Sequence, residues 1–139
     1  PENMRYSIYL MQAEFAMQDQ DYSRAEQAYA TAAKLDADGA MGLMAALGQA
    51  GALIKLDRPA DAVTLLQGLE SRATEDGRAT LRMLLGEAAE AAGKTDVAVA
   101  AYEALAASQP GLDGEFYRSR AEALGGGKTA PVKDGAENK

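Results

Sequence analysis

The chain of 139 residues has the length of a single domain and carries a net charge of −7. It contains no cysteine and no histidine, so disulfide bonds and metal sites with thiolate or imidazole ligands are excluded, together with the catalytic sites that depend on these side chains. The negative charge argues against binding to nucleic acid or to an anionic membrane surface, because both would repel the chain.

The apolar residues are rich in alanine and leucine, and aromatic residues make up only 6% of the chain. This composition favours helices over strands. In chain order, helices are predicted over residues 4–18, 22–36, 40–55, 59–72, 77–92, 95–108 and 114–124. The predicted fold class is therefore all-α, with about seven helices.

Turn and capping signals lie between these segments. Ser23 has the spacing of a capping box with Glu26, and Asp38 is predicted as the N-cap of the third helix. Pro59 stands at a suitable first helical position, and Gly93 at a suitable helix end. The connections between the helices are therefore predicted to be short.

Apolar stripes run along several of the predicted helices with the spacing i, i+3, i+4, i+7. They comprise Ala25, Ala28, Tyr29, Ala32 and Ala33 in the second helix; Ala62, Leu65, Leu66 and Leu69 in the fourth; Leu81, Leu84, Leu85, Ala88, Ala89 and Ala92 in the fifth; and Ala98, Ala101, Tyr102 and Leu105 in the sixth. These stripes are the predicted core.

The stripes repeat along the chain. Ala25, Ala62 and Ala98 open equivalent stripes and lie 37 and 36 residues apart. A small residue stands twelve positions before each of them, namely Ala13, Ala50 and Gly86. An internal period in the thirties indicates a solenoid of stacked helix pairs.

The repeat resembles the tetratricopeptide repeat, whose unit has ~34 residues and the signature W-x2-L-G-x2-Y…A-x3-F…P. The third unit carries Leu85-Gly86, Ala98, Tyr102 and Pro110. The resemblance implies a right-handed α-solenoid of antiparallel helix pairs over residues 1–124, with units at about 6–39, 43–76 and 79–112 and a capping helix at 114–124. Residues 125–139 offer almost nothing to bury and are predicted to be a disordered tail.

Two short motifs resemble ligand sites only in part. Gly127-Lys128-Thr129 resembles a phosphate-binding loop, but Glu122 occupies the place of its first glycine. Asp36 begins a segment that resembles a calcium loop, but Met41 occupies the place of the glycine at the sixth position. We therefore expect no cofactor, no metal site and no enzymatic activity.

The resemblance implies that a protein or peptide binds to the concave face, which the first helix of each pair lines. The repeat alignment gives as candidate peptide-binding residues Leu10, Glu14, Met17, Met44, Leu47, Ile54, Met83, Glu87 and Glu90. Apolar and acidic side chains stand where tetratricopeptide clamps for a carboxylate carry basic side chains and asparagine, so we expect an apolar or basic segment as ligand. A methionine or leucine stripe at helical spacing is, however, more often part of a core than of a binding groove.

Two functions remain open from the sequence. One is an adaptor or chaperone-like scaffold for a partner protein, and the other is a self-assembly module, by analogy with bacterial envelope or assembly complexes. A homo-oligomer is compatible with either function. No segment has the ~20 apolar residues that a membrane helix needs, so membrane insertion is not expected. The sequence does not decide between the cytoplasm and the periplasm as the compartment, because Pro1 does not establish the natural start.

Overall fold

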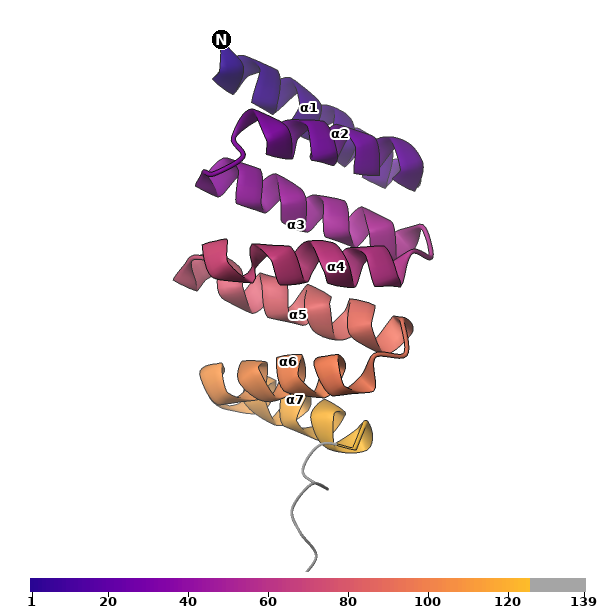
Figure 1. Ribbon diagram of the computed structural model, residues 1–139, viewed down its shortest axis with the longest axis vertical. Coiled ribbons are helices and arrows are strands. Elements are labelled where there is room, and N and C mark those ends of the chain that lie inside the picture. The colour runs from indigo at the N-terminus through magenta and orange to yellow at the C-terminus, as the bar shows by residue number, and fades with distance from the viewer. Residues whose placement is uncertain (126–139) are drawn as a thin grey trace, which may run out of the picture.

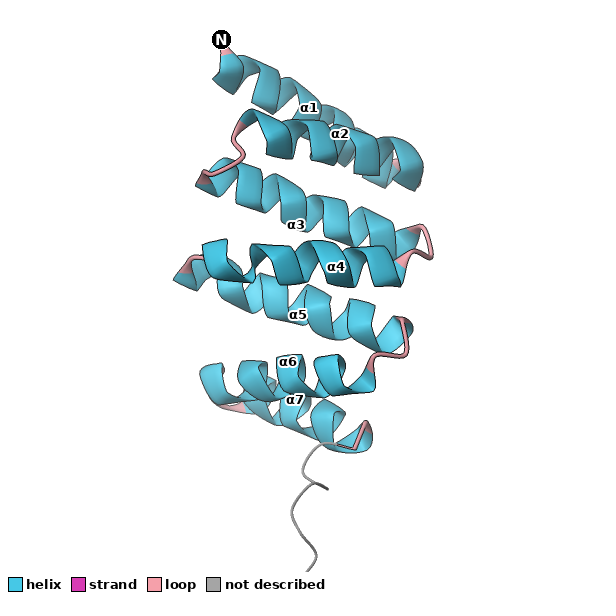
Figure 2. Cartoon of the chain, in the orientation of Figure 1, coloured by secondary structure: helices cyan, strands magenta, loops and turns pink. Residues whose placement is uncertain are grey.

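A computed structural model describes residues 1–125 of the chain. Over that range the chain is all-α, with seven α-helices, one short 3-10 helix and no strand (Figure 2). The helices are α1 (Glu2–Gln18), α2 (Tyr22–Leu35), α3 (Ala40–Lys55), α4 (Pro59–Leu69), α5 (Glu75–Ala91), α6 (Thr95–Ser108) and α7 (Leu112–Ala123), with the 3-10 turn η1 (Glu70–Arg72) after α4. Of the predicted tail, all but Gly125 lies outside the described residues.

The helices form two layers stacked along one long axis. Each helix packs antiparallel on the next, and α2, α4 and α6 lie in one layer over α1, α3, α5 and α7 in the other (Figure 1). Within the second of these layers, α3 also contacts α5 directly. The arrangement confirms the predicted solenoid of antiparallel helix pairs, closed at one end by α7.

The helix boundaries differ from the predicted ones by at most three residues. The largest difference is at the end of α4, where residues 70–72 continue as the 3-10 turn η1 rather than as α-helix. Thr74 then caps α5, because its hydroxyl oxygen accepts a hydrogen bond from the Gly77 backbone N–H at 3.4 Å. Pro59 opens α4 as predicted.

Two predicted N-caps are wrong. Helix α2 begins one residue before Ser23, and the Asp21 carboxylate caps it by accepting from the Arg24 backbone N–H at 3.1 Å. Ser23 already lies inside the first turn, so its hydroxyl is not at the capping position. At α3 the N-cap is Gly39 rather than the predicted Asp38.

The turn between α2 and α3 uses a different aspartate from the one predicted. The Asp36 carboxylate accepts a hydrogen bond from the Gly42 backbone N–H at 3.1 Å, and thus satisfies one donor of the first turn of α3. Asp38 is exposed and has no such contact. Asp36, two residues before Asp38, reaches α3 because the turn folds back beneath that helix.

The core contains the predicted apolar stripes. Ala25, Ala62 and Ala98, the residues that define the repeat, are each 0% exposed. One large cluster extends from α3 to α7, and two small clusters join α1 and α2 to α3. The largest fully buried side chains are Leu66, Leu81, Leu105 and Val63. The outer members of the stripes are only half-buried, namely Tyr29, Ala33, Leu65, Leu84 and Ala92.

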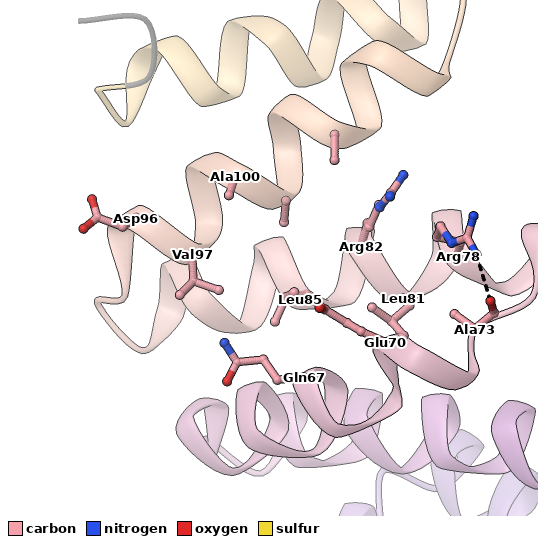
Figure 3. A pocket seen from close by; sticks show the side chains of 12 residues that line it. Gln67, Glu70, Ala73, Arg78, Leu81, Arg82, Leu85, Asp96, Val97 and Ala100 are labelled. Carbon is pink, nitrogen blue, oxygen red and sulfur yellow. Dashed lines mark hydrogen bonds between the residues drawn. The ribbon is translucent and has the colours of Figure 1, made fainter. Parts of the chain in front are cut away.

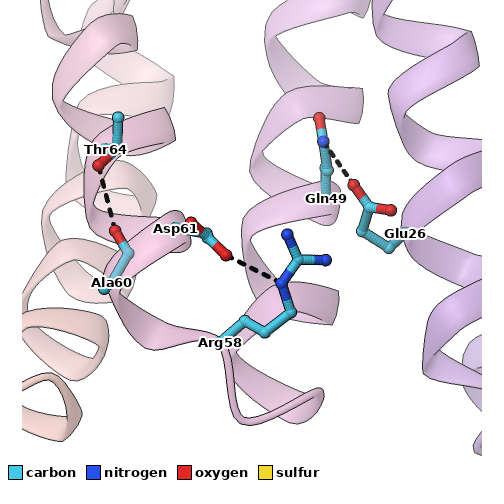
Figure 4. A network of polar contacts seen from close by, with 6 residues as sticks. All are labelled: Glu26, Gln49, Arg58, Ala60, Asp61 and Thr64. Atoms are coloured by element: carbon cyan, nitrogen blue, oxygen red, sulfur yellow. Dashed lines mark hydrogen bonds and ion pairs between the residues drawn. The ribbon is translucent and has the colours of Figure 1, made fainter.

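Polar contacts also join neighbouring helices. The Gln49 side-chain amide on α3 donates a hydrogen bond to the Glu26 carboxylate on α2 at 2.8 Å (Figure 4). At the other end, the Arg120 guanidinium on α7 pairs with the Glu90 carboxylate on α5, with the Nε atom 3.1 Å from Oε2. The capping helix is therefore tied to the last repeat by charge as well as by packing.

Candidate functional site

A pocket opens between the first helices of the second and third units. It has a volume of about 490 Å³, and α3 and the N-terminal half of α5 form its walls. Its lining consists of Ala40, Leu43, Met44, Leu47, Gly48, Thr74, Asp76, Gly77, Thr80 and Leu84. Most of the lining is apolar, and the Met44 side chain stands at the rim with 68% of its surface exposed. A pocket of this kind suits an apolar anchor side chain.

A second, smaller pocket continues toward the capping helix. It has a volume of about 240 Å³ and is lined by Ala79, Thr80, Met83, Leu105, Gln109, Asp113 and Tyr117. Thr80 is exposed and borders both pockets, so it marks the ridge between them. We refer to the two pockets together as the first-helix groove, because α3, α5 and α7 provide most of its lining.

Three of the candidate peptide-binding residues lie in the first-helix groove. Met44 and Leu47 line the larger pocket, and Met83, which is 38% exposed, lines the smaller one. Leu47 belongs mainly to the core, since only 8% of it is exposed and it packs in the large cluster. Leu47 therefore lies at the floor of the pocket.

The other apolar candidates lie deeper than expected. Leu10, Met17 and Ile54 are half-buried, pack against the three core clusters and line neither pocket of the first-helix groove. At the equivalent positions Leu10, Leu47 and Met83 the side chain is half-buried, buried and exposed in turn, whereas Met17, Ile54 and Glu90 are all half-buried.

The three acidic candidates also differ. Glu14 and Glu87 are exposed and line neither pocket. Glu90 is committed to contacts within the protein, since it accepts a hydrogen bond from the Tyr102 hydroxyl at 3.1 Å and pairs with Arg120. Glu90 thus holds α5, α6 and α7 together.

The sequence analysis missed the contribution of α7. Tyr117 and Asp113 line the smaller pocket, and the neighbouring Phe116 is 65% exposed. The repeat contained a signal for this: Gly42 and Gly114 are both buried, and in both cases the backbone of the preceding turn leaves no room for a Cβ atom. Extending the repeat by this spacing of 72 residues aligns Phe116 with Met44.

The first-helix groove is acidic where it is charged. Asp76 and Asp113 are its ionisable residues apart from Tyr117, and no lysine or arginine lines either pocket. Glu87, one turn beyond Met83 on α5, adds a further exposed carboxylate. Its charge, together with burial as the larger cause, raises the pKa of the adjacent Tyr102 hydroxyl. The groove thus presents apolar surface next to negative charge.

A further pocket lies on the other layer. It has a volume of about 540 Å³ between α4, α5 and α6, with Leu81 and Leu85 at its base (Figure 3). Its charged lining is mixed and consists of Arg78, Arg82, Glu70 and Asp96. Arg78 donates a hydrogen bond to the Ala73 carbonyl oxygen at 3.1 Å. This pocket was not predicted, and its opposing charges define no single ligand chemistry.

The stacked helix pairs, the buried alanine repeat and the groove between first helices define a tetratricopeptide-repeat fold. Among solved structures, the TPR domain of Arabidopsis OM64 is similar to this chain, with a TM-score of 0.73. The similarity covers 88% of this chain and 98% of that domain, at 14% sequence identity. No protein-family model and no curated protein sequence matches the chain. The likeness establishes the fold.

None of the helices between residues 1 and 125 combines the length and the apolar character required to cross a membrane. Over the same residues, no cluster of acidic side chains is arranged to hold a metal ion.

Proposed function

We propose that the chain is a protein–protein interaction scaffold that binds a segment of a partner protein in the first-helix groove. The observation that carries the proposal is the apolar pocket between α3 and α5, with the exposed Met44 at its rim. Methionine side chains are flexible and polarisable, so Met44 and Met83 can adapt to anchor side chains of different shapes.

The chemistry of the groove favours an apolar segment that carries positive charge. Burial of an apolar anchor would supply most of the affinity, at roughly 25 cal/mol per Å² before ordering costs are subtracted. Asp76, Asp113 and Glu87 would attract lysine or arginine side chains beside the anchor and would repel a terminal carboxylate.

Filling the groove should weaken the binding of such a segment. Thr80→Trp places a large ring at the ridge between the two pockets, and we expect the affinity for an apolar-basic peptide to fall at least about tenfold. The affinity would be measured by fluorescence anisotropy with peptides selected on an array. Ala100→Trp is the matched control, because Ala100 is also exposed and lines the pocket of the other layer. Loss of binding in the Ala100 variant alone would assign the ligand to that pocket.

The charge preference is tested separately. In Glu87→Lys we expect weaker binding of a basic peptide and tighter binding of an acidic one, with a smaller difference at high salt. Glu87 is exposed, so the fold should be retained. Glu103→Lys makes the same change in net charge at another exposed position. An equal response of both variants would mean that net charge rather than the groove sets the preference.

A further inference from the structure

Helix α1 carries an apolar stripe on the side that faces away from the rest of the protein. Met4, Ile8, Met11 and Phe15 follow the spacing i, i+4, i+7, i+11 and are 62%, 48%, 54% and 58% exposed. The buried residues of α1, by contrast, are Tyr6, Ala13 and Ala16 on its opposite side. Four adjacent large apolar side chains on one helix form a patch of the kind that marks an interaction surface.

The repeat shows what this face does elsewhere in the chain. Positions 37 residues after the stripe are Met41, Ala45, Gly48 and Ala52, on α3. Ala45 and Ala52 are fully buried and share core clusters with Ala32 and Ala25 of α2. The stripe on α1 is therefore the face with which a first helix receives the second helix of the preceding unit, and no described residue covers it.

The two ends of the solenoid differ in this respect. On the outer face of α7, the exposed Leu112 and Phe116 are interrupted by Glu115, Ser119 and Glu122, as expected for an end that meets water. Ser7 and Glu14 flank the stripe on α1 in a similar way, but four large apolar side chains are exposed there, against two on α7. The end at α1 therefore exposes the larger apolar surface.

We propose that the stripe on α1 is covered by α1 of a second copy of this chain, in an antiparallel pair. A two-fold axis between residues 9 and 10 places Met4 against Phe15 of the second copy, and Ile8 against Met11 of the second copy. The stripe is thus complementary to itself over its whole length.

Charge and area are consistent with this occupant. Helix α1 holds two glutamates and one arginine, a net charge of −1, so two copies meet there with little of the repulsion that a chain of net charge −7 would otherwise produce. The four side chains expose roughly 400 Å² per copy, about half of a standard interface. The dimer should therefore be weak and should depend on concentration.

Sedimentation velocity on the full chain, from about 1 to about 500 µM, tests the proposal. We expect a monomer–dimer equilibrium whose dissociation constant rises at least tenfold in Ile8→Glu and in Met11→Glu, with the melting temperature unchanged because both residues are exposed. Gln27→Glu, on the exposed face of α2, adds the same charge and should have no effect. Thr80→Trp should also leave the monomer–dimer equilibrium unchanged, so a failure of the groove proposal can be distinguished from a failure of the dimer proposal.

The orientation has its own test, because the natural chain has no cysteine. In the antiparallel pair, an equimolar mixture of Met4→Cys and Phe15→Cys chains should cross-link with a short bis-maleimide, whereas neither variant should cross-link alone, since like positions lie about 16 Å apart along the helix. A chain that stays monomeric at the highest concentration overturns the proposal, even if the stripe captures another protein. A dimer that Ile8→Glu does not weaken, or Met4→Cys chains that cross-link among themselves, overturn it as well.

Discussion

Replacing Gly42 with alanine should lower the free energy of unfolding by roughly 2–3 kcal/mol, although alanine is the better helix former. Gly42 lies in the first turn of α3, beneath the turn that follows α2. A Cβ atom there would meet the backbone carbonyl group of Asp36, which cannot rotate away as a side chain can. The Asp36 carboxylate also accepts a hydrogen bond from the Gly42 N–H, so a shift of this turn would weaken a cap as well.

The matched control lies nine residues further along α3. No heavy atom lies within 4 Å of the position that a Cβ atom would take at Gly51. Gly51→Ala should therefore raise the free energy of unfolding by up to about 1 kcal/mol, because alanine loses less backbone entropy in a helix. Urea denaturation followed by circular dichroism measures both variants. Equal effects at the two positions would show that the turn between α2 and α3 adjusts freely and that its close approach is not required.

The fold was predictable because its signals recur. The stripes that begin at Ala25, Ala62 and Ala98 repeat both the helical spacing and the longer period, and each repetition reinforces the others. Capping was less predictable. Asp21 and Ser23 are both good N-caps by residue type, and the choice between them depends on where the first helical turn closes.

The sequence predicted which side chains face the groove but not how deeply each of them is buried. Met44 and Leu47 both face it, yet one is a rim residue and the other belongs to the core. Leu47 packs in the large core cluster, and repeat alignment does not contain that information.

The stripe on α1 was missed for a different reason. This helix is apolar on two opposite sides, with Tyr6 and Ala13 on one and Ile8 and Phe15 on the other. Helical periodicity alone cannot distinguish a core face from an uncovered face when both are apolar. The repeat register does distinguish them, since the residues 37 positions after Ile8 and Phe15 are Ala45 and Ala52, which contact the preceding unit.

The largest loss of stability is expected from Tyr102→Ala, at roughly 3–5 kcal/mol. Tyr102 is 5% exposed, and its ring packs on Gly86, where a Cβ atom would come within 2.5 Å of it. The ring also stacks on Tyr117 of the capping helix, with the ring centroids 6.1 Å apart. Truncation would thus open a cavity at the junction of α5, α6 and α7 and release the cap from the last repeat.

Two further variants separate the ring from the hydroxyl group. Tyr102→Phe keeps the packing and loses only the hydrogen bond to Glu90, so it should cost about 1 kcal/mol. Glu87→Ala removes an exposed side chain of α5 and should stay within about 0.5 kcal/mol of the wild type. The three free energies of unfolding would be measured in urea at one pH. If Glu87→Ala were as costly as Tyr102→Ala, the face of α5 that we assign to the groove would instead be packed, and the site would have to be sought between α4 and α6.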